Sequence, residues 1–203
     1  MGLKNAIKDH LRSNLWQYLI LLVVFVLGLV EGNIKACGLS GGTRGHLLDL
    51  LNEFINSSAT YEPGGRLLIP SILAQVKLVV VMWFLGLTVI GTPLVLGLVF
   101  ARGFSLGFTI GFLVNAKGQT GALVALVSVA PQNIIYVPLL ILTSLMSINF
   151  SLFIIKRRSQ IHTSLWKGFA AYTMAMLCYM ILFAGGALIE TYVPPWLLAA
   201  ILK

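Results

Sequence analysis

The side chains that most often do chemistry are few in this chain, and their spacing matches no known site. The two cysteines, Cys37 and Cys178, lie far apart, and the three histidines, His10, His46 and His162, form no ligand pair. There is no Ser/His/Asp or Cys/His set, no phosphate-binding loop and no metal-binding motif. We therefore expect no catalytic residue, no cofactor and no bound metal, and a protein that is not an enzyme.

Polar residues inside apolar runs are the remaining candidates for a site. Asn115 and Lys117 interrupt one run, and Pro131, Gln132 and Asn133 interrupt the next. A proline removes a backbone donor, and amide side chains can compensate for it. Because a lysine at the bilayer centre costs about 2.5–3.5 kcal/mol, we expect Lys117 at a surface or in a water-filled cleft. These residues form a candidate broken-helix polar site, which either stabilises a broken helix or lines a notch that contacts lipid or solute.

Small residues recur on one face of a predicted helix. Gly103, Gly107 and Gly111 are four residues apart, so they lie nearly on one line along a helix. Glycines at this spacing let two helix backbones approach closely. This face is therefore a candidate surface for helix packing or for a partner.

Hydroxyl groups also fall where they can join helices. Pro93 lies within the apolar run 78–101 and should kink it, and Thr88 and Thr92 are placed to cover the carbonyl that the proline leaves free. Three serines on one face of a later run favour packing between helices with modest hydrogen bonds: Ser144, Ser147 and Ser151.

Composition sets the fold class. The chain has 203 residues, of which 58% are hydrophobic and only 10% are charged, against about 25% charged residues in soluble domains. This excludes a soluble enzyme, a disordered chain and a disulfide scaffold, and it predicts an all-α integral membrane protein. The net charge of +8 is typical of basic residues at cytoplasmic helix ends, so we expect a lipid bilayer and no nucleic acid as its surroundings.

The apolar runs predict a single membrane domain over residues 1–203 with about five transmembrane helices. The expected spans are approximately 14–34, 77–101, 103–130, 132–155 and 168–190, with kinks or breaks in the 90–140 region. In a rival interpretation, 103–130 is a re-entrant hairpin. The segment 31–75 is an expected extracytoplasmic loop, in which residues 47–55 have the apolar spacing of an amphipathic helix. That helix lies on the bilayer or the bundle, or it docks a partner.

Basic residues predict the orientation. The short basic arm over residues 1–13 is expected to stay as part of an anchor, which places the amino terminus in the cytoplasm and the carboxyl terminus outside. Arg102 and the cluster at residues 156–158 are then counted as cytoplasmic, whereas Lys77 and Glu190 are counted as external. No carboxylate is expected at membrane depth, which argues against a proton-coupled carrier.

Several sequence pieces resemble one family. These are Ile90-Gly91-x-Pro93, Arg102-Gly103-Phe104 through Phe112, Pro131-Gln132-Asn133 with Pro138, and SINFSLFIIKRR. In this order and spacing, over roughly residues 4–195, the chain resembles the stage II sporulation protein M family.

The resemblance implies a five-span protein of the cell membrane that acts in sporulation, during engulfment. It further implies a non-catalytic scaffold that holds two peptidoglycan-degrading partners, the stage II sporulation proteins D and P. A second copy of the chain is a further candidate partner. A function of another class, a permease- or channel-like transporter subunit, stays open, because broken helices line the substrate path in many transporters.

Overall fold

A computed structural model describes residues 14–39, 41–42, 45–49, 68–88, 90–157 and 163–201, with the side chains of 156–157, 163–165 and 192–201 left out. These ranges contain helices and short turns but no strand. The long helices are α2 (Leu15–Cys37), α4 (Leu68–Gly86), α5 (Gly91–Arg157) and α6 (Thr163–Ile201). All four are long and apolar enough to cross a membrane, which confirms the predicted all-α membrane fold.

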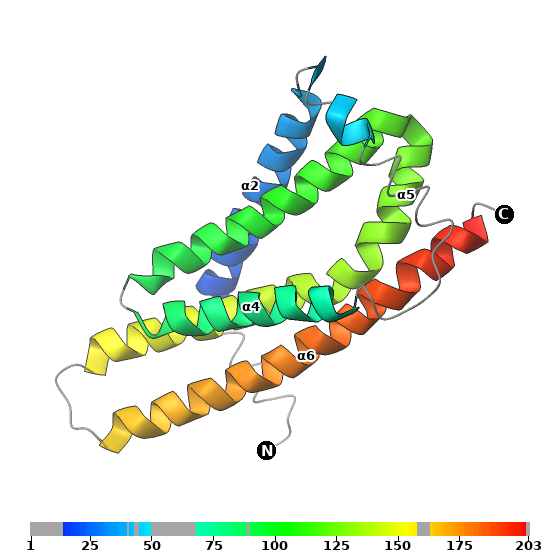
Figure 1. Cartoon of the computed structure of the whole chain (residues 1–203). Helices are drawn as coiled ribbons and strands as arrows, with labels where there is room; N and C mark the ends of the chain where they lie inside the picture. Colours follow the sequence, from blue (N-terminus) through cyan, green and yellow to red (C-terminus); the bar gives the residue numbers. More distant parts are fainter. Residues whose placement is uncertain are drawn as a thin grey trace.

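The helix α5 is two helical arms joined at Gly118. Its 67 residues would extend about 100 Å if straight, whereas the hydrocarbon core of a bilayer is about 30 Å thick. Gly118 has φ 58° and ψ −129°, a conformation that side chains other than glycine rarely adopt. The chain therefore turns back there, as Figure 1 shows, and we call residues 91–117 the first arm and residues 119–157 the second arm.

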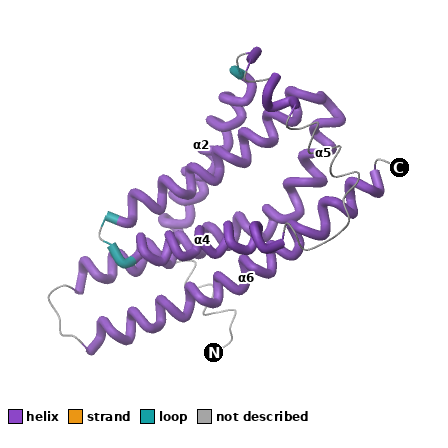
Figure 2. The backbone as a smooth tube through the Cα atoms, viewed as in Figure 1, coloured by secondary structure: helices purple, strands orange, loops and turns teal. Residues whose placement is uncertain are grey.

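The bundle has two ends, named here after the turns that form them. Residues 87–90 connect α4 to the first arm at the Gly91 end, and Gly118 lies at the other. α2 ends at the Gly118 end, where Asn115 donates a hydrogen bond from Nδ2 to the Cys37 sulfur over 3.0 Å. α2 and the first arm thus run parallel, side by side (Figures 1 and 2). The two arms would provide two crossings, so five crossings in all stay a prediction.

Two helices extend into the predicted loop 31–75, which leaves only residues 38–67 between them. Glu31 and Lys35 do not end α2, because they lie one turn apart on its exposed side and pair at 4.0 Å. Pro70 falls in the first turn of α4, where a missing N–H costs nothing. Residues 45–49 are helical, and the rest of the predicted amphipathic helix lies outside the described residues.

The predicted span 77–101 is wrong, because the chain turns in its middle. α4 ends at Gly86 and α5 begins at Gly91. Pro93 lies in the first turn of α5 and therefore kinks nothing. Thr88 does not cover a carbonyl freed by Pro93, as was expected. It donates instead to the carbonyl of Leu85 at 2.9 Å, in the last turn of α4.

The remaining boundaries also shift. Gly118 breaks α5, whereas Pro131, where a break was expected, lies inside the continuous second arm, as does Pro138. The expected spans 103–130 and 132–155 are therefore divided at the wrong residue. α6 covers the expected 168–190 and continues to Ile201. Proline is tolerated in such helices because neighbouring groups satisfy the carbonyl that it leaves free.

Glycines bring α2 and the first arm into backbone contact. A Cβ on Gly103 would overlap the carbonyl oxygen of Phe25, and one on Gly107 would overlap that of Leu29. On the facing helix, Gly28 approaches the carbonyl of Phe100 in the same way. The glycine face predicted from the sequence, Gly111 included, therefore packs against α2 of the same chain, which leaves no room there for a partner.

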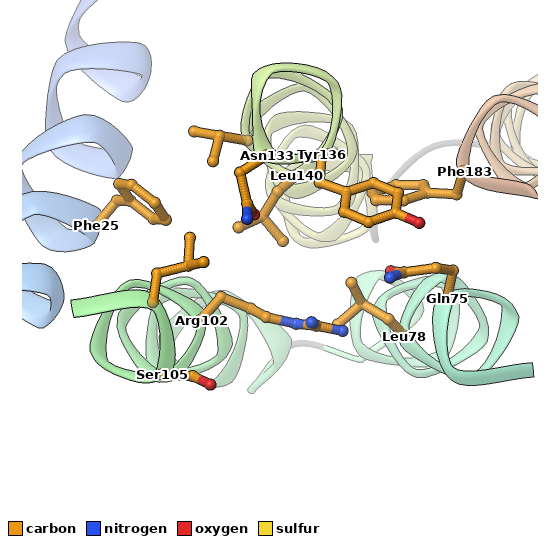
Figure 3. A pocket seen from close by; sticks show the side chains of 11 residues that line it. Phe25, Gln75, Leu78, Arg102, Ser105, Asn133, Tyr136, Leu140 and Phe183 are labelled. Atoms are coloured by element: carbon orange, nitrogen blue, oxygen red, sulfur yellow. The ribbon is translucent and has the colours of Figure 1, made fainter. Parts of the chain in front are cut away.

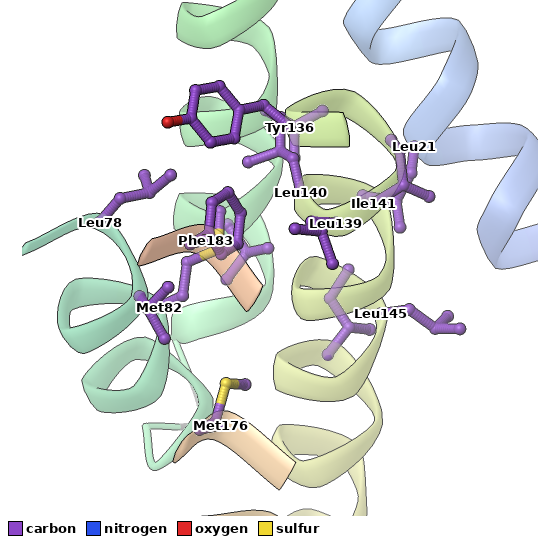
Figure 4. Close-up of a cluster of buried hydrophobic side chains, with 14 of the residues drawn as sticks. Leu21, Leu78, Met82, Tyr136, Leu139, Leu140, Ile141, Leu145, Met176 and Phe183 are labelled. Carbon is purple, nitrogen blue, oxygen red and sulfur yellow. The ribbon is translucent and has the colours of Figure 1, made fainter. Parts of the chain in front are cut away.

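Hydroxyl groups complete the end of α4. The last carbonyls of a helix have no partner within it and need other donors when water is excluded. In the last turn, Tyr172 donates to the carbonyl of Trp83 at 3.1 Å. Just before it, Ser147 donates to that of Met82 at 3.1 Å, and just beyond the helix Ser151 donates to that of Thr88 at 2.8 Å. The second arm and α6 thus let α4 end against the bundle. Around these bonds, apolar side chains from all four long helices form one core (Figure 4).

We expect Gly107→Leu to lower the free energy of unfolding by about 3 kcal/mol, because a side chain cannot fit against the α2 backbone. Thermal unfolding of the purified chain in mild detergent measures this. Gly97 is the matched control, since nothing lies within 4 Å of a Cβ there. Gly97→Leu should stay within about 1 kcal/mol of the wild type. Equal losses in both variants would show that the close contact contributes little.

Candidate polar site at the centre of the bundle

All five helical segments line one cavity of about 70 Å³. Its polar lining consists of Gln75 from α4, Arg102 and Ser105 from the first arm, and Asn133 and Tyr136 from the second arm. Figure 3 shows Arg102 extending between the first arm and α4, toward Gln75. Apolar side chains complete the wall: Phe25, Leu78, Leu106, Val137, Leu140 and Phe183.

The cavity lies at the middle of the bundle. One lining residue from each segment falls within two residues of that segment's centre: Phe25, Leu78, Arg102, Val137 and Phe183. For a bundle that spans a bilayer, this is the depth at which burying a charge is most costly. A guanidinium at this depth requires nearby groups that compensate its charge.

A carboxylate compensates part of this charge from the neighbouring helix. Tyr136 donates a hydrogen bond to Oε2 of Glu190 on α6 over 2.8 Å. Arg102 is attracted electrostatically to Glu190, and the Gln75 amide interacts with Tyr136. The site therefore connects α4, both arms of α5 and α6 through polar side chains.

Arg102 and Glu190 do not touch directly. Within the described chain, the guanidinium forms no hydrogen bond and no ion pair of 4.0 Å or less. A water molecule needs roughly 10–15 Å³ of probe-occupied space and two to four polar partners, so the cavity has room for several. Water can thus solvate the guanidinium and carry its attraction to the carboxylate.

This arrangement corrects two expectations. Arg102 was expected at the cytoplasmic boundary and Glu190 at the external one, but the structure brings them into one site. A single arginine between two apolar runs looks like the end of a span, whereas here it is near the middle of the first arm. Glu190 nevertheless lies at the end of the apolar stretch Trp166–Thr191 of α6, as expected.

The predicted broken-helix site is divided. Asn115 and Lys117 lie at the Gly118 end, where Asn115 also donates to the carbonyl of Gly111 at 3.0 Å. Lys117 is exposed there, as expected of a surface lysine. Neither residue lines the cavity.

The second half of that predicted site reaches the cavity through one residue. Asn133 lines it and donates from Nδ2 to the carbonyl of Val129 at 2.7 Å, which supplies a donor close to Pro131, where the backbone has none. Oε1 of Gln132 is buried without a hydrogen-bond partner in the described structure. Both interpretations of Asn133, support of an irregular helix and contact with a notch, thus have a structural basis.

Comparison with known proteins gives the family. A model of the family described as stage II sporulation protein M matches residues 18–195. The chain belongs to this family. It is accordingly a membrane protein of sporulation, which agrees with its apolar helices. No match is found among curated proteins or among solved structures.

Of the polar residues at the centre, the sequence pattern pointed only to Asn133. Gln75, Arg102, Tyr136 and Glu190 come from four helical segments, and no local spacing connects them. The available signal was that Arg102 lies within a family motif and between two uncharged runs. Within the described residues, no group of three or more His, Cys, Asp or Glu side chains gathers as metal ligands would.

We expect Arg102→Gln and Glu190→Gln each to lower the free energy of unfolding by about 2 kcal/mol, because each leaves a half-buried charge uncompensated. The double variant should lose no more than either single variant, since their effects share one interaction. Unfolding in detergent measures all three. The exposed pair Glu31 and Lys35 is the control, and its coupling should stay below about 0.5 kcal/mol. Additive losses at Arg102 and Glu190 would contradict the coupling.

Proposed function

We propose that the protein is a non-catalytic membrane scaffold that assembles or localises peptidoglycan-degrading partners during engulfment. The expected partners are the stage II sporulation proteins D and P, as the family resemblance implies. The segment that would hold them is residues 38–67, between α2 and α4, on the extracytoplasmic side in the predicted orientation.

The observation that carries the proposal is the rigid support of this segment at both ends. Before it, the last turn of α2 is held on the first arm: Ala36 is buried at 4% exposure and Cys37 accepts the bond from Asn115. After it, α4 packs against α5 and α6. A segment of this size is below the usual limit for an independent fold. Such an arrangement suits presentation of a binding segment and does not suit hydrolysis.

A transporter subunit is the second candidate, favoured by one observation. Arg102 lines a polar cavity near the middle of the helices and is attracted by the Glu190 carboxylate nearby. Intramembrane ionisable residues commonly mark ion or solute pathways. The cavity of about 70 Å³ is small against the roughly 300–1,000 Å³ of typical small-molecule sites. In the conformation described, it takes water or a small ion, so we rank transport below the scaffold.

Replacing residues 40–66 with a Gly/Ser linker of equal length should abolish partner binding while leaving α2 and α4 whole. The tagged protein is purified in mild detergent from sporulating cells, and proteins D and P are quantified by mass spectrometry. Their recovery should fall at least about tenfold, which corresponds to about 1.4 kcal/mol. A linker in place of residues 158–162, between α5 and α6, is the matched control and should change nothing. Undiminished recovery with the 40–66 linker would contradict the proposal.

If the protein transports an ion or solute, Arg102→Gln should lower flux into proteoliposomes by about tenfold or more, because the guanidinium is the fixed charge on the path. Ser105→Ala changes the same wall of the cavity without changing charge and should keep most of the flux. Absence of flux by the wild type across ions and small solutes would remove this candidate.

A further inference from the structure

Lys77 is the middle residue of α4 and lies on the side of that helix opposite the core. The core side carries Gln75, Leu78 and Met82, all buried. Lys77 is exposed, and so are large apolar side chains around it, among them Leu73 at 60% and Phe84 at 58% exposure. The outward face of α4 is thus apolar with one cation at its centre.

The depth of Lys77 follows from its neighbour. Leu78 lines the central cavity, to which every helical segment contributes a residue from its middle. The Cα atom of Lys77 therefore lies at about the same depth in the bundle as the cavity, and its side chain is on the opposite side of α4. A lysine there costs about 2.5–3.5 kcal/mol on insertion scales, and charged residues in membrane helices almost always face an interior or a water-filled cavity. This one faces outward.

Nothing in the described chain neutralises Lys77. The ion pair of 4.0 Å or less between described residues joins Lys35 to Glu31 instead. A second copy offers no suitable carboxylate among its described acids. Glu190 is already hydrogen-bonded to Tyr136 within the bundle, and Glu31 and Asp49 belong to the Gly118 end or to the segment beyond it. Among the described residues of this chain and of a second copy, none supplies a countercharge for Lys77.

We propose that this face docks a transmembrane helix of another protein that carries an Asp or Glu at mid-depth. The docking face consists of Lys77 with the exposed side chains that surround it on α4: Leu73, Val80, Val81 and Phe84. Its apolar residues match a helix from the bilayer, and its lysine selects the one with a carboxylate. The proposal deepens the scaffold function and rests on it, since it names a second contact by which a membrane-anchored partner is held.

The test uses the full chain in phosphatidylcholine vesicles and a defined probe. The probe is a labelled Leu-rich transmembrane peptide of about 21 residues with one Glu at its centre. Peptides with Gln or Lys at that position are its controls. Energy transfer from labelled protein to peptide measures binding. The variants are Lys77→Leu and Lys77→Arg, with Lys35→Gln as a lysine control near a helix end.

The wild type should bind the Glu peptide about tenfold more tightly than the Gln peptide and should reject the Lys peptide. Lys77→Leu should abolish this preference, whereas Lys77→Arg and Lys35→Gln should keep it. Because Lys77 is exposed, Lys77→Leu should unfold at an unchanged or higher temperature, so lost binding is not lost folding. No preference for the Glu peptide, or a preference that survives Lys77→Leu, overturns the proposal.

The two proposals fail separately. The peptide assay contains neither protein D nor protein P, so it measures only binding at the outward face of α4. Loss of those partners on exchange of residues 40–66, together with a negative peptide assay, would keep the scaffold and remove the α4 contact.

Discussion

Backbone contact between α2 and the first arm of α5 is the constraint on which the rest of the bundle depends. Gly28 and Gly103 let each helix approach a carbonyl of the other, so the two parallel helices are fixed in both distance and register. Lipid tails are as apolar as leucine, and close packing of this kind is what holds membrane helices together. With this pair fixed, α4, the second arm and α6 pack beside it and line the central cavity with it.

The polar groups of the bundle follow from the absence of water. The carbonyls at the end of α4 take donors from serine and tyrosine hydroxyls of other helices. The guanidinium of Arg102 has no such direct partner and lies beside a cavity that water can fill. Lys77 has neither a partner nor a cavity in the described chain. The carbonyls thus have direct hydrogen-bond donors, Arg102 has a cavity that can hold water, and Lys77 has neither. Lys77, on the outer surface, is therefore the polar group with the least compensation for its removal from bulk water.

Local patterns in the sequence predicted the local features. The glycine repeat at Gly103 and Gly107 and the serines at Ser147 and Ser151 each lie on one helix face, and both sets pack as that spacing predicts. Span boundaries were harder, because a charged residue was taken as the end of a span. Arg102 and Lys77 in fact lie near the middle of helices. The break in α5 depends on the positive φ of Gly118, which glycine can adopt but which the presence of a glycine does not by itself predict. The polar residues of the central site come from four segments far apart in the chain, and a local sequence pattern cannot predict that they lie close together.

The parallel pairing of α2 with the first arm has a consequence for synthesis. The glycines of α2 emerge from the ribosome well before their partners, since Gly28 precedes Gly103 by 75 residues. At about 5–20 residues per second, α2 waits roughly 4–15 s in or near the bilayer with its glycine groove uncovered. Through that interval the groove is open to any other small-residue helix nearby, including α2 of a neighbouring nascent chain. Wrong pairing of α2 in this interval is therefore limited by how few small-residue helices lie near it.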